Sequence, residues 1–483
     1  MDPILYWNEV VNEADRTTHT TLAPEEAGSR GPCGSSRAYA IVHLAMHDAY
    51  FGINGKYAPY LAGLPTPDSG ANADSAVAAA AHATLSALYP AQKAFFDAQH
   101  AAAGLPGGQS GSDGHEFGLA VAATILAFRK DDPGLSDNGY ASSVARMRHR
   151  KDPDNPTQPF YAPFYGARSR NFAVKTRHHL DESPQLGSDE YTRALRQVRS
   201  KGIAPHLIGM LPANLLPSRT PTETVIGVFW GYDGAKGLGT PPRLYNQIVR
   251  KIADRQANDV AANARLFAVV NAALGDAGIL AWDDKYIYDV WRPVVGIREH
   301  DPSTGPTGVG GNVLDVDADP GWLPLGAPNT NNVGQKIGQK NGTPPFPAYP
   351  SGHATFGAAA FQSVRCFYGK GEYSPDDVVG DLEFVSEEFN GISVDNTGAV
   401  RPRHARNFPG GLWQMIEENG RSRVFLGVHW VFDAFAVNEN NEIDLTQNIG
   451  GVRLGLDIAN DIATNGLTAA AAAGPRLPLN HQI

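Results

Sequence analysis

Hydrophobic positions along the chain recur mostly at spacings of three and four, and the strict alternation of a half-buried strand is rare. Between residues 35 and 53, Ala38, Ile41, Val42 and Ala45 share one helical face, and serines at its start are available as N-caps. Similar patterns predict helices over 75–103 with a break at Pro90, 115–130, 188–201, 221–230, 242–280 and 284–297, and from 351, 412 and 423 onward. The pattern predicts an all-α protein whose helices pack as bundles.

Prolines and polar residues interrupt the helical pattern in three places. Residues 148–172 are charged and rich in proline, which is typical of a long surface loop. The break at 212–224 indicates a domain boundary, so we expect an N-terminal helical bundle over residues 1–215 and a C-terminal one over 216–483. The third interruption, at 301–349, is rich in glycine, proline and asparagine, and loops of that length inside a compact domain are either functional or disordered.

The composition indicates a protein with a large hydrophobic core and an acidic net charge. Hydrophobic residues make up 42% of the chain and charged residues 19%, so a large core can form. The net charge of −10 argues against nucleic acid or an anionic membrane as partner, although it allows a local cationic pocket. No apolar run is long enough to span a bilayer, and the first residues do not lead us to expect an ordinary signal peptide. We expect a soluble protein that is cytoplasmic or is secreted by a non-classical route. Its two cysteines, Cys33 and Cys366, cannot build a disulfide framework.

Two short segments carry basic and hydroxyl residues in a suggestive order. Lys285 and Arg292 are seven residues apart, which is two turns of a helix, so they are expected to emerge from one helical face. The segment Pro350 to His353 closes the long loop and opens a helix. Proline suits a first turn, the exposed N–H groups of that turn attract an anion, and Gly352 lets a ligand approach the backbone closely.

A third segment completes the set. Arg423 and His429 are six residues apart, about 120° out of register on a helix, so only the long reach of Arg423 lets both address one centre. Each segment alone is more often an ordinary solvated face or turn. Together they supply three cations, a hydroxyl, helix-end amides and two imidazoles. This combination suits one small tetrahedral oxyanion, because guanidinium groups match its oxygens in pairs and lysine adds a point charge.

These three segments resemble a known signature. KYIYDVWRP, PSGH and SRVFLGVH are similar to the pattern K-x6-RP, PSGH, SR-x5-H of the superfamily that joins vanadium-dependent haloperoxidases with acid phosphatases. Segments such as YWNEVVNEADRTTHT, FWGYDGAKGLGTPPRLYNQIVRKIA and GGVRLGLDIANDIATNGL resemble vanadium chloroperoxidases, so the likeness covers most of the chain. It implies two four-helix bundles with a vanadate cofactor, which phosphate can replace, at the end of the C-terminal bundle.

The resemblance also implies a role for each matching residue. Carried over by position, the residues that hold vanadate would be Lys285, Arg292, Ser351, Gly352, Arg423 and the metal ligand His429. His353 would be the catalytic acid–base group. Asp233, in FWGYDG, would pair with Arg423 and so orient it. Trp282 and Phe346 match the aromatic positions of the chloroperoxidases, where an apolar rim could desolvate chloride.

The implied reaction oxidises halide with hydrogen peroxide. His353 would accept a proton from the peroxide and Lys285 would hydrogen-bond it, before chloride or bromide attacks to give hypohalous acid. An organic halogen acceptor is an additional candidate partner. The alternative is a phosphomonoesterase that uses the same pocket, with His429 as nucleophile and His353 protonating the leaving group. The chain-wide likeness, together with Trp282 and Phe346, favours the haloperoxidase.

Two other segments have the spacing of metal ligands. His43 and His47 have zinc-ligand spacing, but Leu44 replaces the glutamate of a metalloprotease motif, and a structural histidine pair is the better interpretation. The second segment contains Asp315, Asp317 and Asp319, which alternate like the start of a calcium-binding loop. Pro320 stands where such a loop needs glycine, so an EF-hand is rejected, while a structural cation stays an open alternative.

Overall fold

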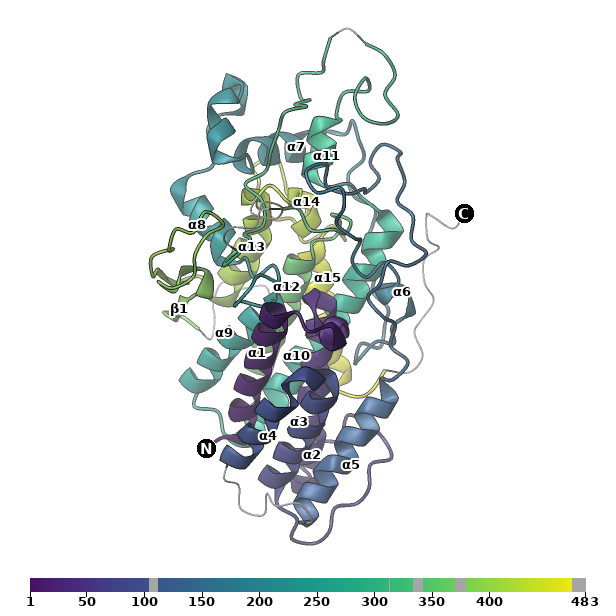
Figure 1. Ribbon diagram of the computed structural model, residues 1–483, viewed down its shortest axis with the longest axis vertical. Coiled ribbons are helices and arrows are strands. Elements are labelled where there is room, and N and C mark those ends of the chain that lie inside the picture. The colour runs from purple at the N-terminus through teal and green to yellow at the C-terminus, as the bar shows by residue number, and fades with distance from the viewer. Residues whose placement is uncertain (104–111, 312, 333–341, 370–378, 471–483) are drawn as a thin grey trace.

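The computed structural model describes the chain except residues 104–111, 312, 333–341, 370–378 and 471–483 (Figure 1). Fifteen α-helices are described: α1 Pro3–Thr21, α2 Gly31–Asn54, α3 Ala73–Leu88, α4 Lys93–Ala102, α5 Asp113–Phe128, α6 Tyr165–Arg168, α7 Asp189–Lys201, α8 Pro221–Phe229, α9 Pro241–Arg255, α10 Val260–Tyr288, α11 Pro293–Arg298, α12 Gly352–Phe367, α13 Gly411–Phe425, α14 Val431–Ala434 and α15 Gly451–Asn465. Short 3-10 helices are η1 Pro24–Ser29, η2 Pro90–Gln92, η3 Pro205–Met210, η4 Ala213–Leu215 and η5 Glu387–Phe389. The described strands are β1 Glu383–Val385 and β2 Ala405–Asn407, an antiparallel pair. The all-α fold class is confirmed.

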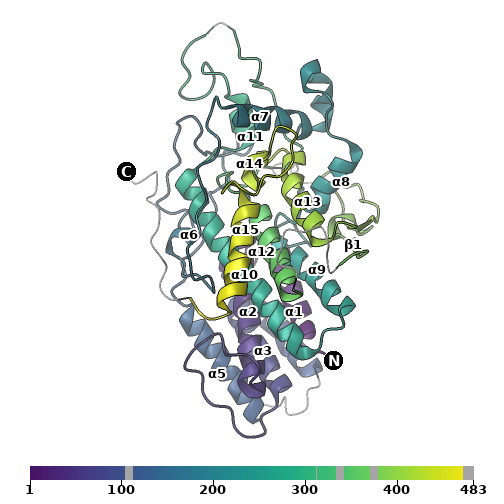
Figure 2. The same ribbon diagram turned by 180° about the vertical axis from the view of Figure 1, so that it is seen from behind.

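The long helices form two packed groups stacked along the long axis of the molecule. α2, α3 and α5 pack against one another with α1 beside them, at the lower end of Figure 1. α10, α12 and α15 pack together and α13 lies against α12, with α15 in front of this group in the view from behind (Figure 2). α10 also packs along α2, so it joins the two groups. The boundary at residues 215 and 216 stays a prediction.

α10 is the central helix of the fold. Among the described residues it is the helix long and apolar enough to cross a membrane, and 89% of its apolar window is buried inside the protein. A helix that is hydrophobic on all sides and covered on all sides is a core helix. The expected absence of membrane and nucleic-acid partners stays a prediction, as does the cellular compartment.

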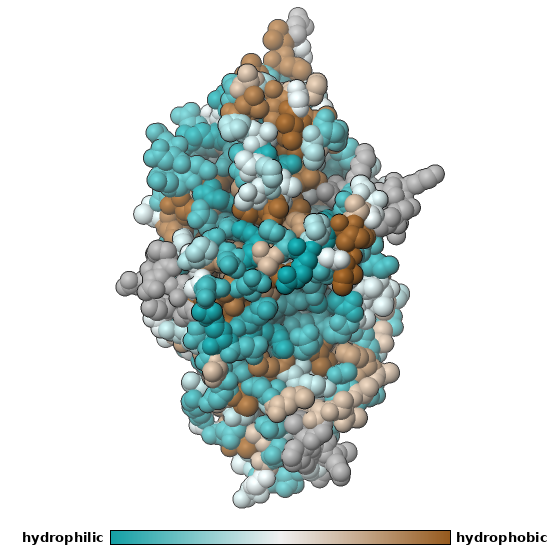
Figure 3. All heavy atoms as spheres, turned by 90° about the vertical axis from the view of Figure 1, so that its left-hand side faces the viewer, coloured by the Kyte–Doolittle hydropathy of each residue, from teal (hydrophilic) through white to brown (hydrophobic). Residues whose placement is uncertain are grey.

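One face of the molecule is mainly polar. Figure 3 shows the face that carries α8 and β1, where hydrophilic side chains cover most of the middle and hydrophobic ones gather toward the upper end. Both cysteines are free thiols, so Cys33 and Cys366 do not pair.

Three details of the predicted helices are wrong. The predicted 242–280 helix is two helices, because Ala257 adopts a left-handed conformation (φ 51°) and Asp259 caps a new helix by accepting a bond from the Ala262 amide at 2.7 Å. The predicted helix over 284–297 does not exist as one element, because α10 ends at Tyr288. Helix α2 begins at Gly31, and no serine caps it.

Tertiary contacts explain the early start of α2. The Tyr161 hydroxyl accepts bonds from the amides of Cys33 and Gly34 at 3.2 and 3.3 Å. The free N–H groups of a first helical turn need such acceptors. A side chain distant in sequence therefore does what a local serine was expected to do, and no local pattern predicts it.

Candidate active site

Three helix ends meet at one end of the second group. Lys285 lies in the last turn of α10, Ser351 caps the start of α12, and Arg423 lies in the last turn of α13. A cavity of about 350 Å³ lies next to them, and its lining includes Gly352, His353, Arg423 and His429. The structure therefore brings together residues that lie up to 144 positions apart in the sequence.

Lys285 and Arg292 converge, although not by the predicted route. Asp289 ends α10 in a left-handed conformation (φ 52°), and Arg292 is the N-cap of α11 with an extended backbone. The expectation that both emerge from one continuous helix is therefore wrong. The physical reason is Pro293, since a residue before proline is disfavoured in the helical conformation.

Lys285 is fully buried and its ammonium is held by the loop before α12. Its Nζ donates to the carbonyls of Pro347, Ala348 and Pro350 at 2.8, 3.1 and 2.5 Å. Burial, and then the positive charge of Arg292, lower its pKa well below the ordinary value. All three N–H groups are thus used by backbone, so a hydrogen bond from Lys285 to peroxide requires one of these bonds to exchange.

Both arginines are buried and each keeps one unused nitrogen. Arg292 donates through Nε to the Phe346 carbonyl at 2.8 Å and through Nη1 to the Val428 carbonyl at 2.9 Å. Arg423 donates to both carboxylate oxygens of Asp233, at 3.1 and 2.7 Å. Arg292 Nη2 and Arg423 Nε are buried without a hydrogen-bond partner in the part of the chain that the structure describes. Burial lowers the pKa of Arg292 to about 9.

His429 has two distinct ring nitrogens. Its Nδ1 donates to Asp433 Oδ2 at 2.7 Å, while Nε2 accepts from Arg292 Nη1 at 2.8 Å, because a guanidinium can only donate. Burial and the charges of Arg292 and Lys285 lower its pKa well below the ordinary value, so the imidazole is neutral. Nε2 is therefore the nitrogen with the lone pair, and this lone pair accepts from Arg292. His429 lies beyond the end of α13, so the expectation that it shares a helix with Arg423 is wrong; Gly427, at φ 74°, reverses the chain instead.

Asp433 orients His429, and its loss should weaken anion binding. Asp433→Asn removes the charged acceptor that keeps the proton on Nδ1, and such outer partners are worth about 10- to 100-fold in metal affinity. We expect the dissociation constant for orthovanadate, measured by titration calorimetry, to rise by about that factor. Asp457→Asn, at a half-buried aspartate of α15 paired with Arg453, is the matched control. Equal affinities in the two variants would contradict this role.

His353 lines the same cavity as His429, and one of its two ring nitrogens makes a hydrogen bond. Its Nε2 donates to the Gly231 carbonyl at 2.8 Å, and the same nitrogen is 3.9 Å from Asp233 Oδ1. Its own carbonyl accepts from Asn419 Nδ2 at 2.7 Å and from the Tyr245 hydroxyl at 3.2 Å, which fixes the first turn of α12. Burial, and then the charge of Arg423, lower its pKa to about 4. The imidazole is therefore neutral at neutral pH, with Nδ1 as its basic nitrogen.

The start of α12 forms the floor of the cavity. Ser351 caps the helix, and its hydroxyl accepts from the Ala354 amide at 3.4 Å; Pro350 precedes this cap and does not lie in the first turn. A Cβ on Gly352 would lie 3.1 Å from the Trp282 ring, so glycine allows this close approach.

An aromatic wall stands beside this floor. The Trp282 and Phe346 rings are 4.8 Å apart, and Lys285 Nζ lies 5.5 and 5.1 Å from their centroids. Tyr161 contacts both rings at 5.8 and 6.0 Å and continues the wall outward. The wall is apolar next to a strongly cationic site, and this strengthens the electrostatic interactions made there.

The two histidines of α2, which have zinc-ligand spacing, are held by hydrogen bonds. His43 uses both ring nitrogens, with the Tyr39 carbonyl at 2.8 Å and Asn8 Nδ2 at 2.9 Å. His47 also uses both, with Asp48 at 3.0 Å and Arg265 at 3.3 Å. The pair is structural, as expected.

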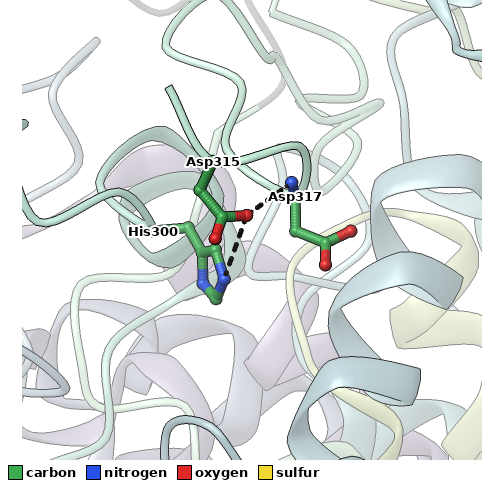
Figure 4. A group of neighbouring side chains, drawn as sticks. All are labelled: His300, Asp315 and Asp317. Carbon is green, nitrogen blue, oxygen red and sulfur yellow. Dashed lines mark hydrogen bonds and ion pairs between the residues drawn. The ribbon is translucent and has the colours of Figure 1, made fainter. Parts of the chain in front are cut away.

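The acidic segment near residue 315 does gather potential ligands. His300, Asp315 and Asp317 lie together on the loop after α11 (Figure 4), with His300 Nε2 3.8 Å from Asp315 Oδ1. Both carboxylate oxygens of Asp317 already accept from Arg196 at 2.9 Å. The guanidinium therefore neutralises the negative charge that would attract a metal cation. A structural cation at this loop stays an open alternative, and the pairing of Asp317 with Arg196 does not favour it.

Comparisons with known proteins give the family. One family model, the vanadium chloroperoxidase N-terminal domain, matches residues 1–171, and another, the VCPO second helical-bundle domain, matches 265–442. The vanadium chloroperoxidase of Curvularia inaequalis is 36% identical over 96% of this chain and 90% of its own length. The chain belongs to the vanadium chloroperoxidase family. It is therefore a vanadium-dependent haloperoxidase, and its cofactor is vanadate.

Solved structures agree on the fold. A bacterial vanadium-dependent iodoperoxidase matches with a TM-score of 0.60 at 18% identity, over 95% of this chain and 96% of that one. An apo-type bacterial vanadium-dependent chloroperoxidase also has a TM-score of 0.60, at 16% identity, over 91% of this chain and 95% of that one. At these identities the likeness establishes the shared architecture.

The residues present fit an oxyanion cofactor. Three buried cations face two carboxylates, Asp233 and Asp433, so the site carries excess positive charge. Two buried guanidinium nitrogens, Arg292 Nη2 and Arg423 Nε, have no acceptor among the described residues, and both arginines lie near the neutral imidazole of His429. Buried charges and donors without partners are costly, so an anion with several oxygens stabilises this arrangement.

Proposed function

We propose that Lys285, Arg292, Arg423 and His429 hold the vanadate of this haloperoxidase, with Ser351 and the Gly352 amide completing the site. The observation that carries the proposal is that Arg292 Nη2 and Arg423 Nε are buried without a hydrogen-bond partner among the described residues, near the neutral imidazole of His429. His429 would bond the metal through Nε2, because Nδ1 donates to Asp433, and the hydrogen bond that Nε2 accepts from Arg292 Nη1 would be released to a vanadate oxygen. The cations would neutralise the charge of the vanadate oxygens.

His353 would handle the proton in this reaction. Hydrogen peroxide and halide are the substrates. When bound, vanadate acts as a Lewis acid that makes a peroxide oxygen electrophilic toward halide. His353 Nδ1 would accept the peroxide proton, because its Nε2 donates to Gly231 and burial keeps the ring neutral. Lys285 and Arg292 would stabilise the negative charge that develops next to them.

The aromatic wall would favour chloride as well as bromide. The rings of Trp282 and Phe346 lie 5.5 and 5.1 Å from Lys285 Nζ and would limit the access of water to that side of the site. Partial loss of hydration makes chloride easier to oxidise at a strongly cationic centre. The product would be hypohalous acid, which leaves through the cavity or meets an organic acceptor there.

The test is a halogenation assay with a parallel phosphatase assay. Purified protein is mixed with orthovanadate, hydrogen peroxide and chloride or bromide, and halogenation of a cyclic diketone is followed. Release of nitrophenol from its phosphate ester is followed without vanadate. We expect halogenation that requires vanadate and is suppressed by phosphate, since both anions compete for one pocket. Vanadate-inhibited phosphatase activity without halogenation at any halide would support the phosphomonoesterase instead.

A further inference from the structure

One short turn carries two contacts of the site. In the Gly231–Asp233 turn after α8, the Gly231 carbonyl accepts from His353 Nε2 at 2.8 Å, and Asp233 pairs with Arg423 at 2.7 and 3.1 Å. Tyr232, between them, adopts a left-handed backbone conformation at φ 54°, which costs free energy in a bulky residue. The turn needs a stabilising contact, because His353 and Arg423 both take their orientation from it.

Glu388 lies directly behind this turn. Its side chain, on η5, is fully buried, and its Oε1 accepts from the Tyr232 amide at 3.3 Å. A Cβ placed on Gly231 would lie 2.6 Å from the same oxygen, so the carboxylate packs against the backbone of the turn. The other oxygen, Oε2, accepts from the Thr330 hydroxyl and from Arg401 Nη1, each at 2.6 Å.

We propose that Glu388 is a positioning residue of the haloperoxidase site, which fixes the Gly231–Asp233 turn and through it the orientation of His353 and Arg423. The inference rests on the proposed function of those two residues. Thr330 and Arg401 hold the carboxylate from the side away from the turn, so the chain of contacts runs from the long loop through Glu388 to the site.

A role in the core alone does not account for this arrangement. A buried carboxylate is costly, and burial raises the pKa of Glu388 to about 7 even though Arg401 opposes the shift. Replacing buried ion pairs by apolar side chains is often neutral or stabilising. A fully connected polar network, by contrast, fixes one geometry, and this network ends on the backbone that positions the site.

The test compares two neighbouring glutamates by their effect on anion binding. In Glu388→Gln one carboxylate oxygen is replaced by an NH2 group, which cannot accept a hydrogen bond. If the NH2 group faces Tyr232, the bond from the Tyr232 amide is lost. If it faces Thr330 and Arg401, the bond from Arg401 is lost. Glu387→Gln is the matched control, because Glu387 sits on the same turn of helix but its side chain pairs with Arg243. Orthovanadate dissociation constants are measured by titration calorimetry, together with the melting temperatures.

We expect Glu388→Gln to weaken orthovanadate binding about tenfold and Glu387→Gln to change it less than about twofold. In an Asp233→Asn background, Glu388→Gln should change binding less than about twofold, because the turn no longer positions Arg423. An unchanged dissociation constant, or the same factor in both backgrounds, would overturn the inference while leaving the proposed function intact. Wild-type protein that fails to bind orthovanadate would overturn both.

A second variant covers the case in which Glu388→Gln does not fold. Thr330→Val keeps the volume of the buried Thr330 side chain and removes one hydroxyl donor from Glu388. It should weaken orthovanadate binding several-fold and should also lose its effect in the Asp233→Asn background. Binding equal to the wild type in Thr330→Val would count against the role of Glu388.

Discussion

The His429→Ala variant is expected to lose vanadate affinity by at least about 100-fold, which corresponds to about 2.7 kcal/mol. His429 Nε2 is the neutral nitrogen that faces the buried cations, and the proposal makes it the metal ligand. Lys285, Arg292 and Arg423 stay in place, so weak electrostatic binding of orthovanadate should persist. Halogenation at micromolar vanadate should fall below detection for the same reason.

The matched control for this variant is His47→Ala. His47 is also fully buried, and its Nδ1 is bonded to Asp48 as that of His429 is to Asp433. His47 lies on α2, away from the cavity lining, so its removal should cost stability without changing the vanadate dissociation constant. Similar affinities in the His429 and His47 variants would show that His429 is not the ligand.

The His353→Ala variant is expected to separate turnover from binding. A positioned acid–base group contributes about 10²- to 10⁴-fold to rate, so kcat should fall by that factor. The vanadate dissociation constant should change less than about fivefold, because Arg292 and Arg423 keep their own contacts. Steady-state kinetics with varied peroxide, combined with calorimetry, measures both quantities. A kcat within about tenfold of the wild type would contradict the role of His353.

The pH dependence should follow from the same residue. Burial and Arg423 lower the pKa of His353 to about 4 in the vanadate-free protein. The basic form is therefore present above this pH and is lost as the pH falls through it. We expect an acid limb in the pH profile of kcat/KM for peroxide in the wild type, and no such limb in His353→Ala. An identical acid limb in both proteins would assign it to another group.

The residues that meet at the site could be predicted because their spacing and chemistry are local. Lys285 and Arg292 were expected on one helix, yet they converge across a helix end, because Pro293 stops one helical path and starts another. Arg423 and His429 converge in a similar way through the turn at Gly427. The pattern thus indicates the side chains that the structure gathers at the site, but the backbone geometry that it predicts between them is wrong.

The supporting residues could not be predicted in the same way. Asp433 stands four residues after His429, a spacing that could have suggested the contact, but the loss of helix after Phe425 makes that spacing unreliable. Gly231, Asn419 and Glu388 act through backbone groups of segments distant in sequence, and such contacts leave no spacing to read. The tertiary fold alone brings them to the site.

The most direct test of the account is to locate vanadium in a crystal soaked with orthovanadate. Anomalous differences collected on either side of the vanadium absorption edge identify the element and its position. The account predicts one strong peak within bonding distance of His429 Nε2, enclosed by Lys285, Arg292 and Arg423. A vanadium peak bound elsewhere, or halogenating crystals without a peak at His429, would contradict it.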